Sequence, residues 1–257
     1  IDWDPFFTLR GLEVAATPWQ YVVLRMKATQ SGGGELFWTS ATEGKYGGFE
    51  EDKRTSFQVI GDGAWHDVVL FPFWHTEGVI RQLRLDLYDG AAFEIDSIAI
   101  RSWGDDRIPD TATVEWRFDG SAPPWPQLSA PAAQWSYPLR LDVADKGWVS
   151  VTMTAAKDGV ATFLYASTAR AGAQSEDFAV RGDGRPRTYN LELGALPAWT
   201  TVVAVGMSIP SDLGASVESL VIGAAPRGPA EVRVSYLGFE NAVNRAGRAN
   251  SVLLQLT

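Results

Sequence analysis

The sequence contains no cysteine and only two histidines, His66 and His75, among its 257 residues. The absence of cysteine excludes disulfide bonds, thiolate catalysis and cysteine-ligated zinc. The two histidines form neither an H-x-H nor an H-E-x-x-H arrangement, so a metal site built on histidine would need acidic residues to complete it. Most covalent and metal-dependent chemistry therefore lacks the residues that it requires.

Long hydrophobic runs and an excess of positive charge are also missing. No run approaches the roughly 20 apolar residues of a membrane helix, so we expect no membrane span. The formal net charge is −9, whereas proteins that bind nucleic acids present a basic surface. We therefore expect no nucleic-acid partner. A neutral ligand fits this charge more easily than an acidic one, although a local cluster of arginines could still bind an acidic group.

The sequence does not carry the signature of an enzyme. It has no G-x-S-x-G elbow, P-loop or dinucleotide-binding fingerprint. The run Glu50, Glu51 and Asp52 is typical of a solvated turn, and Glu94 and Asp96 share one strand face, where a cap or a metal site is favoured over catalysis. We expect a protein without catalytic activity.

What the sequence does contain is a series of short alternating runs separated by Gly, Asp, Pro and Ser, a pattern typical of an all-β fold. One run places Val22, Leu24 and Met26 on one face, and another does the same with leucines at 83, 85 and 87. We expect strands at residues 21–28, 35–41, 55–60, 65–71, 81–88, 93–100, 113–120, 148–155, 161–168, 176–181, 187–193, 201–209 and 215–223.

The order of these runs is repeated. A Gly-Asp-Gly turn at 61–63 reappears at 182–184, and six strands follow the same order in both halves. This indicates duplication of a domain of about 100 residues, a common domain size, in which each copy has its own core. We expect domains at 1–104 and 111–225.

Residues 229–257 read as the start of a further β module or as docked strands. Because Ile1 is not preceded by a basic signal-peptide region, we expect the chain to be part of a longer protein.

The strand ending in Arg25-Met26, the Phe37-Trp38 pair, the G-D-G-x-W-H turn, Leu-Arg-Leu-Asp and Ile-Asp-x-Ile together resemble the galactose-binding-like jelly-roll β-sandwich. More narrowly, they resemble the carbohydrate-binding-module-like domains of multimodular bacterial glycan-active proteins. The resemblance covers residues 15–103 well and 140–222 more loosely, and the end of the chain resembles the start of an Ig-like module.

The resemblance implies two tandem sandwiches that bind a polysaccharide or oligosaccharide without catalysis. It also implies an attached catalytic module and an extracellular or cell-surface location in a bacterium. The alternative is a pair of spacer or protein-interaction modules without a glycan site, because a fold does not fix a function.

A glycan site needs an aromatic platform beside fork-like hydrogen-bonding groups. Tyr46 and Trp74 lie in expected loops and are our candidate stacking residues, while the face of Trp38 is undecided. Arg84 and Asp86 are the candidate polar partners, together with Arg25, although Arg84 and Asp86 also fit an ordinary ion-paired strand face. The tryptophans that we assign to the core are Trp65, Trp116 and Trp148.

The resemblance also implies a structural calcium ion near the N-terminal and last strands. Calcium takes six to eight oxygen ligands from carboxylates and carbonyls. Asp2, Asp4 and Asp96 are the candidate ligands. The alternative is that these residues cap turns or face solvent.

Overall fold

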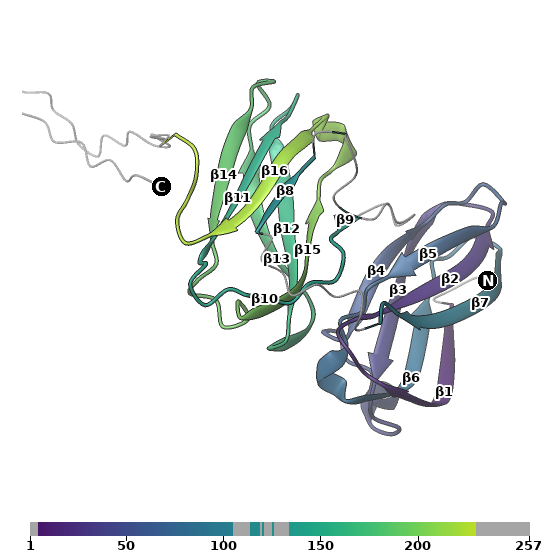
Figure 1. Ribbon diagram of the computed structural model, residues 1–257. Helices are drawn as coiled ribbons and strands as arrows, with labels where there is room; N and C mark the ends of the chain where they lie inside the picture. The colour runs from purple at the N-terminus through teal and green to yellow at the C-terminus, as the bar shows by residue number, and fades with distance from the viewer. Residues whose placement is uncertain (1–4, 105–113, 119, 121–124, 126–133, 230–257) are drawn as a thin grey trace, which may run out of the picture. The chain divides into compact units, whose positions relative to one another are not determined.

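The computed structural model describes residues 5–104, 114–118, 120, 125 and 134–229 (Figure 1). The module expected at 229–257 therefore lies, apart from Pro229, outside the described residues, as do Asp2 and Asp4. The expectation of an all-β fold made of two sandwiches is confirmed, and its strands are antiparallel. No helix of the described segments has the length and apolar character needed to cross a bilayer.

The first sandwich is formed by β1–β7. One sheet has the order β1 (Phe6–Ala15), β6 (Val79–Asp86), β3 (Gly32–Thr39) and β4 (Arg54–Val59). The other has the order β5 (His66–Leu70), β2 (Gln20–Ala28) and β7 (Phe93–Ser102). Two short 3-10 turns, η1 (Lys45–Gly48) and η2 (His75–Glu77), lie in its loops.

The second sandwich is formed by β8–β16. One sheet has the order β10 (Leu141–Asp142), β15 (Thr201–Ser208), β12 (Gly159–Ser167) and β13 (Arg170–Val180), and β9 (Gln134–Trp135) also pairs with β15. The other has the order β14 (Arg187–Glu192), β11 (Trp148–Thr154), β16 (Ser216–Gly223) and β8 (Glu115–Arg117). A 3-10 turn, η4 (Ser211–Leu213), precedes β16.

Each sandwich has its own hydrophobic core, because alternate residues of each strand face inward. In the first, Val22, Leu24 and Met26 are at most 1% exposed. In the second, the equivalent positions of β11 are equally buried. Of the three tryptophans assigned to the core, Trp116 is buried and Trp148 is half-buried. The assignment of Trp65 was wrong, since it precedes β5 in a turn and is 39% exposed.

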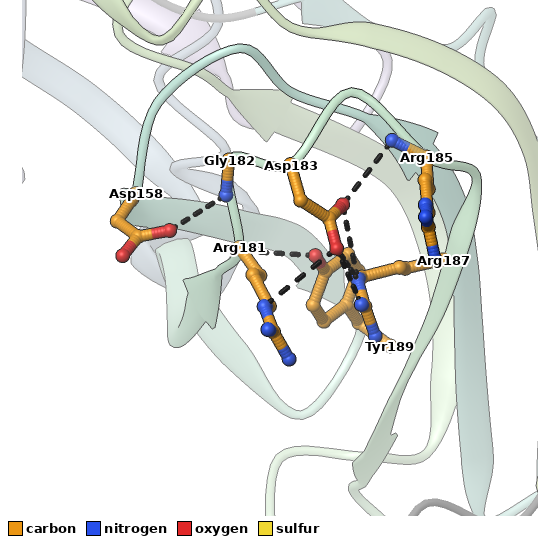
Figure 2. A network of polar contacts seen from close by, with 7 residues as sticks. All are labelled: Asp158, Arg181, Gly182, Asp183, Arg185, Arg187 and Tyr189. Carbon is orange, nitrogen blue, oxygen red and sulfur yellow. Dashed lines mark hydrogen bonds and ion pairs between the residues drawn. The ribbon is translucent and has the colours of Figure 1, made fainter.

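The two Gly-Asp-Gly turns have the same atomic construction. The amide of Gly63 donates to Ala28 O and that of Gly184 to Ala155 O, both at 2.9 Å. In the second turn, a Cβ on Gly182 would lie 2.0 Å from the carbonyl carbon of Lys157, so only glycine fits there. Figure 2 shows this second turn, in which the carboxylate of Asp183 faces the guanidinium of Arg187.

The copies also share a strand irregularity. The pairing of β2 with β7 shifts register between Arg25 and Met26, and the pairing of β11 with β16 shifts between Thr152 and Met153. Opposite these shifts, His66 pairs with Met26 and Arg187 with Met153. A β-bulge at the same place in both copies supports the duplication read from the sequence.

Candidate functional site

A groove of about 700 Å³ lies on the first sandwich, over the face of the β1-β6-β3-β4 sheet that points away from the core. This volume falls within the range of about 300–1,000 Å³ that is common for ligand sites. Its floor comes from β3 and β6, and one wall is the loop at residues 40–53. The lining residues are Glu35, Phe37, Thr39, Ser40, Ala41, Glu43, Gly44, Lys45, Tyr46, Gly48, Phe49, Glu50, Glu51, Lys53, Arg84 and Asp86.

The loop at 40–53 presents an aromatic ring to solvent. Tyr46 is 70% exposed and has left-handed backbone angles, φ 55° and ψ 26°. Such angles are uncommon for a residue with a side chain, so the surrounding loop must hold them in place. At Gly48, a Cβ would lie 2.6 Å from the Cβ of Ala41, which shows how closely the two arms of the loop approach.

A buried glutamine fixes this loop to the sheet. Gln82 of β6 is 2% exposed, and its side-chain amide donates to Ala41 O at 2.7 Å and to Gly47 O at 2.9 Å. Both donors of the amide are therefore used on opposite arms of the loop. Gln82 positions the segment that carries Tyr46.

A second anchor joins the loop to η2. The carboxylate of Glu77 accepts hydrogen bonds from the backbone amide and the hydroxyl of Ser40 and lies 3.2 Å from Lys53 Nζ. Lys53 Nζ is also 3.2 Å from Glu50. Partial burial alone would lower the pKa of Lys53, but hydrogen bonds and the charges of Glu50 and Glu77 outweigh it and raise that pKa above its usual value.

The floor of the groove presents a fixed ion pair between aromatic rings. Arg84 donates from Nε to Asp86 Oδ1 at 2.7 Å and from Nη2 to Oδ2 at 2.6 Å. The guanidinium carbon lies 4.6 Å from the centre of the Phe6 ring and 5.5 Å from that of Phe37. Phe6 pairs with Asp86 across β1 and β6 and is 56% exposed, so its ring lies against Arg84 at the edge of the sheet, next to the lining residues of the groove.

Three of the residues proposed from the sequence, Tyr46, Arg84 and Asp86, thus line one cavity. Arg84 and Asp86 do form an ion pair, as the alternative interpretation expected. That pair lies on the groove floor with side-chain exposures of 23% and 16%. Their part in binding a glycan stays a prediction.

Trp74 and Trp38 are corrections to the candidate set. Both are 0% exposed, and their rings meet edge to face in the core of the first sandwich with centres 6.2 Å apart. Trp74 Nε1 donates to the side chain of Gln20 at 2.6 Å. Neither ring can stack on a ligand, and both stabilise the sandwich instead.

The loop that carries Trp74 is used for packing. Phe71 and Phe73 lie against Trp135, with the Phe73 and Trp135 ring centres 4.8 Å apart. These rings belong to a small third cluster with Trp19 and Val203, distinct from the two large cores. Aromatic content in this loop therefore serves the fold rather than a ligand.

Arg25 lies on a different surface from the groove. It is on β2, in the other sheet of the sandwich, where it pairs with Asp67 at 3.1 Å and with Asp96 at 3.7 Å. Its guanidinium carbon is 5.7 Å from the centre of the Trp65 ring. Residue parity places Arg25 and Arg84 on non-core faces, but it does not say which sheet each strand joins.

The calcium prediction is not settled by these residues. Asp96 has a half-exposed side chain that forms the ion pair with Arg25, and Asp2 and Asp4 lie outside the described residues. Within the described ranges, no three His, Asp or Glu side chains gather as a metal site would require.

Sequence reasoning missed three residues of the site: Phe6, Phe37 and Gln82. Phe37 and Gln82 lie in expected strands, at the parity opposite to the core leucines, and that signal was available. Phe6 lies in β1, which was not expected, because the register of β1 shifts between Arg10 and Val14 and breaks its alternation.

The second sandwich has no equivalent loop. β12 and β13 are joined by Thr168 and Ala169 alone, whereas β3 and β4 are joined by residues 40–53. Strand pairing places Gly206 where the first copy has Arg84, Ser208 where it has Asp86 and Ala204 where it has Gln82. The loop, its glutamine and the ion pair occur together in the first copy and are replaced together in the second.

No family model matches the chain, and no curated protein matches it. Among solved structures, the chain is similar to the N-terminal CBM22-1-CBM22-2 tandem domain of Xyn10C from Paenibacillus barcinonensis. That similarity covers 86% of this chain and 83% of the other, at 12% sequence identity and a TM-score of 0.25. At this identity no residue role passes from that protein to this chain, so the site is argued from its own geometry.

Proposed function

We propose that the chain is a non-catalytic glycan-binding tandem whose first sandwich holds a polysaccharide in the groove beside residues 40–53. The observation that carries this proposal is that the exposed ring of Tyr46 lines a groove whose floor presents the Arg84–Asp86 pair, and that a second exposed ring, Phe6, lies against Arg84. A groove of this kind offers both an apolar surface and fixed polar groups.

The chemistry of a sugar matches these two features. The C–H faces of a pyranose ring are apolar and pack against aromatic rings, as other apolar groups do. Its hydroxyl groups can donate to carboxylates and accept from a guanidinium in a fixed orientation. For a shallow, preformed site of this size, we expect millimolar to micromolar binding, about −4 to −8 kcal/mol.

In the same proposal, the second sandwich has a different role from the first. Gly206 replaces Arg84 there, and a Cβ at Gly206 would lie 2.9 Å from the ring of Trp135, so the indole of Trp135 occupies the space beside this glycine. We assign the second copy a structural function, as the spacer alternative describes. The wider setting that we propose is an extracellular bacterial protein with an attached catalytic module, and a calcium ion held by Asp2, Asp4 and Asp96.

The test is a glycan array followed by affinity gels with the full chain, with and without EDTA. Tyr46→Ala and Phe6→Ala should each weaken binding about tenfold, because truncation of an aromatic anchor typically costs more than 1 kcal/mol. Trp65→Ala is the matched control, since Trp65 is an exposed ring on the other sheet, and it should leave binding unchanged.

Two results would contradict the proposal. Failure of the full chain to bind any glycan would favour the spacer function for both copies. Loss of binding in Trp65→Ala and Arg25→Ala, with Tyr46→Ala unaffected, would move the site to the outer face of the β5-β2-β7 sheet.

A further inference from the structure

The charge around the groove is unevenly distributed. Five of its lining residues are acidic and three are basic. The acidic ones are Glu35, Glu43, Glu50, Glu51 and Asp86, and the basic ones are Lys45, Lys53 and Arg84. The lining residues therefore carry a formal net charge of −2 (three positive minus five negative), which is part of the −9 of the whole chain.

The three basic residues are already engaged within the protein. Arg84 forms its two-pronged contact with Asp86, and Lys53 lies between Glu50 and Glu77. Lys45 Nζ lies 4.8 Å from the centre of the Tyr46 ring. Asp86 already offsets the charge of Arg84, so a ligand carboxylate that approached the remaining N–H groups of Arg84 would also meet the negative charge of Asp86.

The neighbouring Arg54 is engaged in the same way. Its Nη1 lies 2.6 Å from Glu35 and 3.3 Å from Glu51. A sugar therefore meets carboxylate oxygens that can accept further hydrogen bonds, the N–H groups of Arg84 that Asp86 does not occupy, and the two exposed rings. These groups suit hydroxyl-rich, uncharged sugars and oppose an added negative charge.

We propose that the groove selects uncharged glycans and excludes polysaccharides that contain uronate residues. This inference rests on the proposed function and adds the ligand class to it. Because the excluding charges lie at the surface, the exclusion is strong at low ionic strength and weakens when salt shortens the range of the interaction.

The experiment compares matched polysaccharides on native affinity gels of the full chain. The probes are xylan with glucuronoxylan, and a soluble glucan with the same glucan oxidised to the carboxylate at C6. At least one neutral member should retard the protein, and its uronate partner should bind about tenfold more weakly at low salt. The double substitution Glu43→Gln, Glu51→Gln should reduce this preference about two- to fivefold per charge removed.

Glu94→Gln is the control, because Glu94 lies on β7 in the other sheet, where it pairs with Lys27, and it should leave the preference unchanged. Equal or tighter binding of the uronate partner would overturn the selection for uncharged glycans while leaving glycan binding intact. Absence of retardation by every probe, together with a blank array, would overturn the proposed function itself.

Discussion

Asp62 and Asp183 show how one turn is completed by two different side-chain partners, His66 and Arg187. Asp62 accepts from the backbone amide of Ala64 and lies 2.9 Å from His66 Nε2, whereas Asp183 accepts from the amide of Arg185 and from the guanidinium of Arg187. Both partners lower the pKa of the aspartate, and Arg187 lowers that of Asp183 to about 2. The turn therefore tolerates His or Arg at this position as long as the side chain can donate to the carboxylate.

The pKa of Asp183 predicts a stability that depends on pH. A carboxylate with a folded pKa of about 2, against 3.8 ordinarily, favours the folded state above pH 4 and loses this contribution as the pH falls from about 4 to 2. Arg187→Ala should raise the pKa of Asp183 toward its ordinary value, as measured by carboxyl NMR titration. Arg185→Ala is the control, because only its backbone amide bonds Asp183, and an equal shift there would contradict the assignment to Arg187.

At the scale of elements, the loop at 40–53 depends on one glutamine from the sheet. Gln82→Ala, which places in β6 the residue found at 204 in the second copy, removes both bonds to the loop. Loss of these bonds should lower the free energy of unfolding by about 1–3 kcal/mol and should make the part of the loop that carries Tyr46 more mobile. We expect faster hydrogen exchange at residues 40–53, measured by mass spectrometry, and about tenfold weaker glycan binding.

Two further variants separate positioning from general destabilisation. Gln82→Glu keeps the shape but cannot donate to carbonyls when ionised, so it should behave like the alanine variant. Gln58→Ala removes an exposed glutamine from β4, at the edge of the same sheet, and should change neither measurement. Unchanged exchange in the loop of Gln82→Ala would show that Ser40, Glu77 and Lys53 hold the loop without it.

Strands were predictable where the alternation is uninterrupted. Val22, Leu24 and Met26 follow period two over a whole strand, and parity alone places them in the core. β1 was not predictable in this way, because its register shifts between Arg10 and Val14. Parity assigns a residue to one face of a strand, but long-range pairing decides which sheet the strand joins. Parity alone therefore grouped Arg25 of β2 with Arg84 of β6, although the two strands belong to different sheets.

Loop aromatics were the least predictable part of the site. Tyr46 and Trp74 both lie in Gly- or Pro-containing segments with no periodicity, and one is 70% exposed while the other is fully buried. What separates them is contact with distant residues, since Trp74 meets Trp38 and Gln20. The burial of Trp38 could have been predicted, because Trp38 lies on the same strand face as the buried Leu36.

At the scale of the whole molecule, two large cores imply two units of stability. Leu24→Ala should destabilise the first sandwich by about 2–5 kcal/mol, because a buried side chain is replaced by a cavity. Hydrogen exchange should then accelerate in residues 20–102 and much less in 148–223. Met153→Ala, in the core of the second sandwich, should show the reverse pattern.

Equal acceleration in both halves after either substitution would contradict this prediction. It would mean that the third cluster, with Phe73 and Trp135, couples the two sandwiches into one cooperative unit.

The unequal connections between equivalent strands have a consequence for engineering. The β12–β13 hairpin of the second sandwich turns in two residues, whereas the β3–β4 hairpin of the first turns in fourteen, residues 40–53. The two sheets that carry these hairpins have equivalent strand orders. The sheet thus accepts either a short or a long connection at this turn, and the long loop can vary at positions that do not anchor it to the sheet. Randomising positions 43, 45 and 51 would give a set of variants that share one scaffold and differ in ligand specificity.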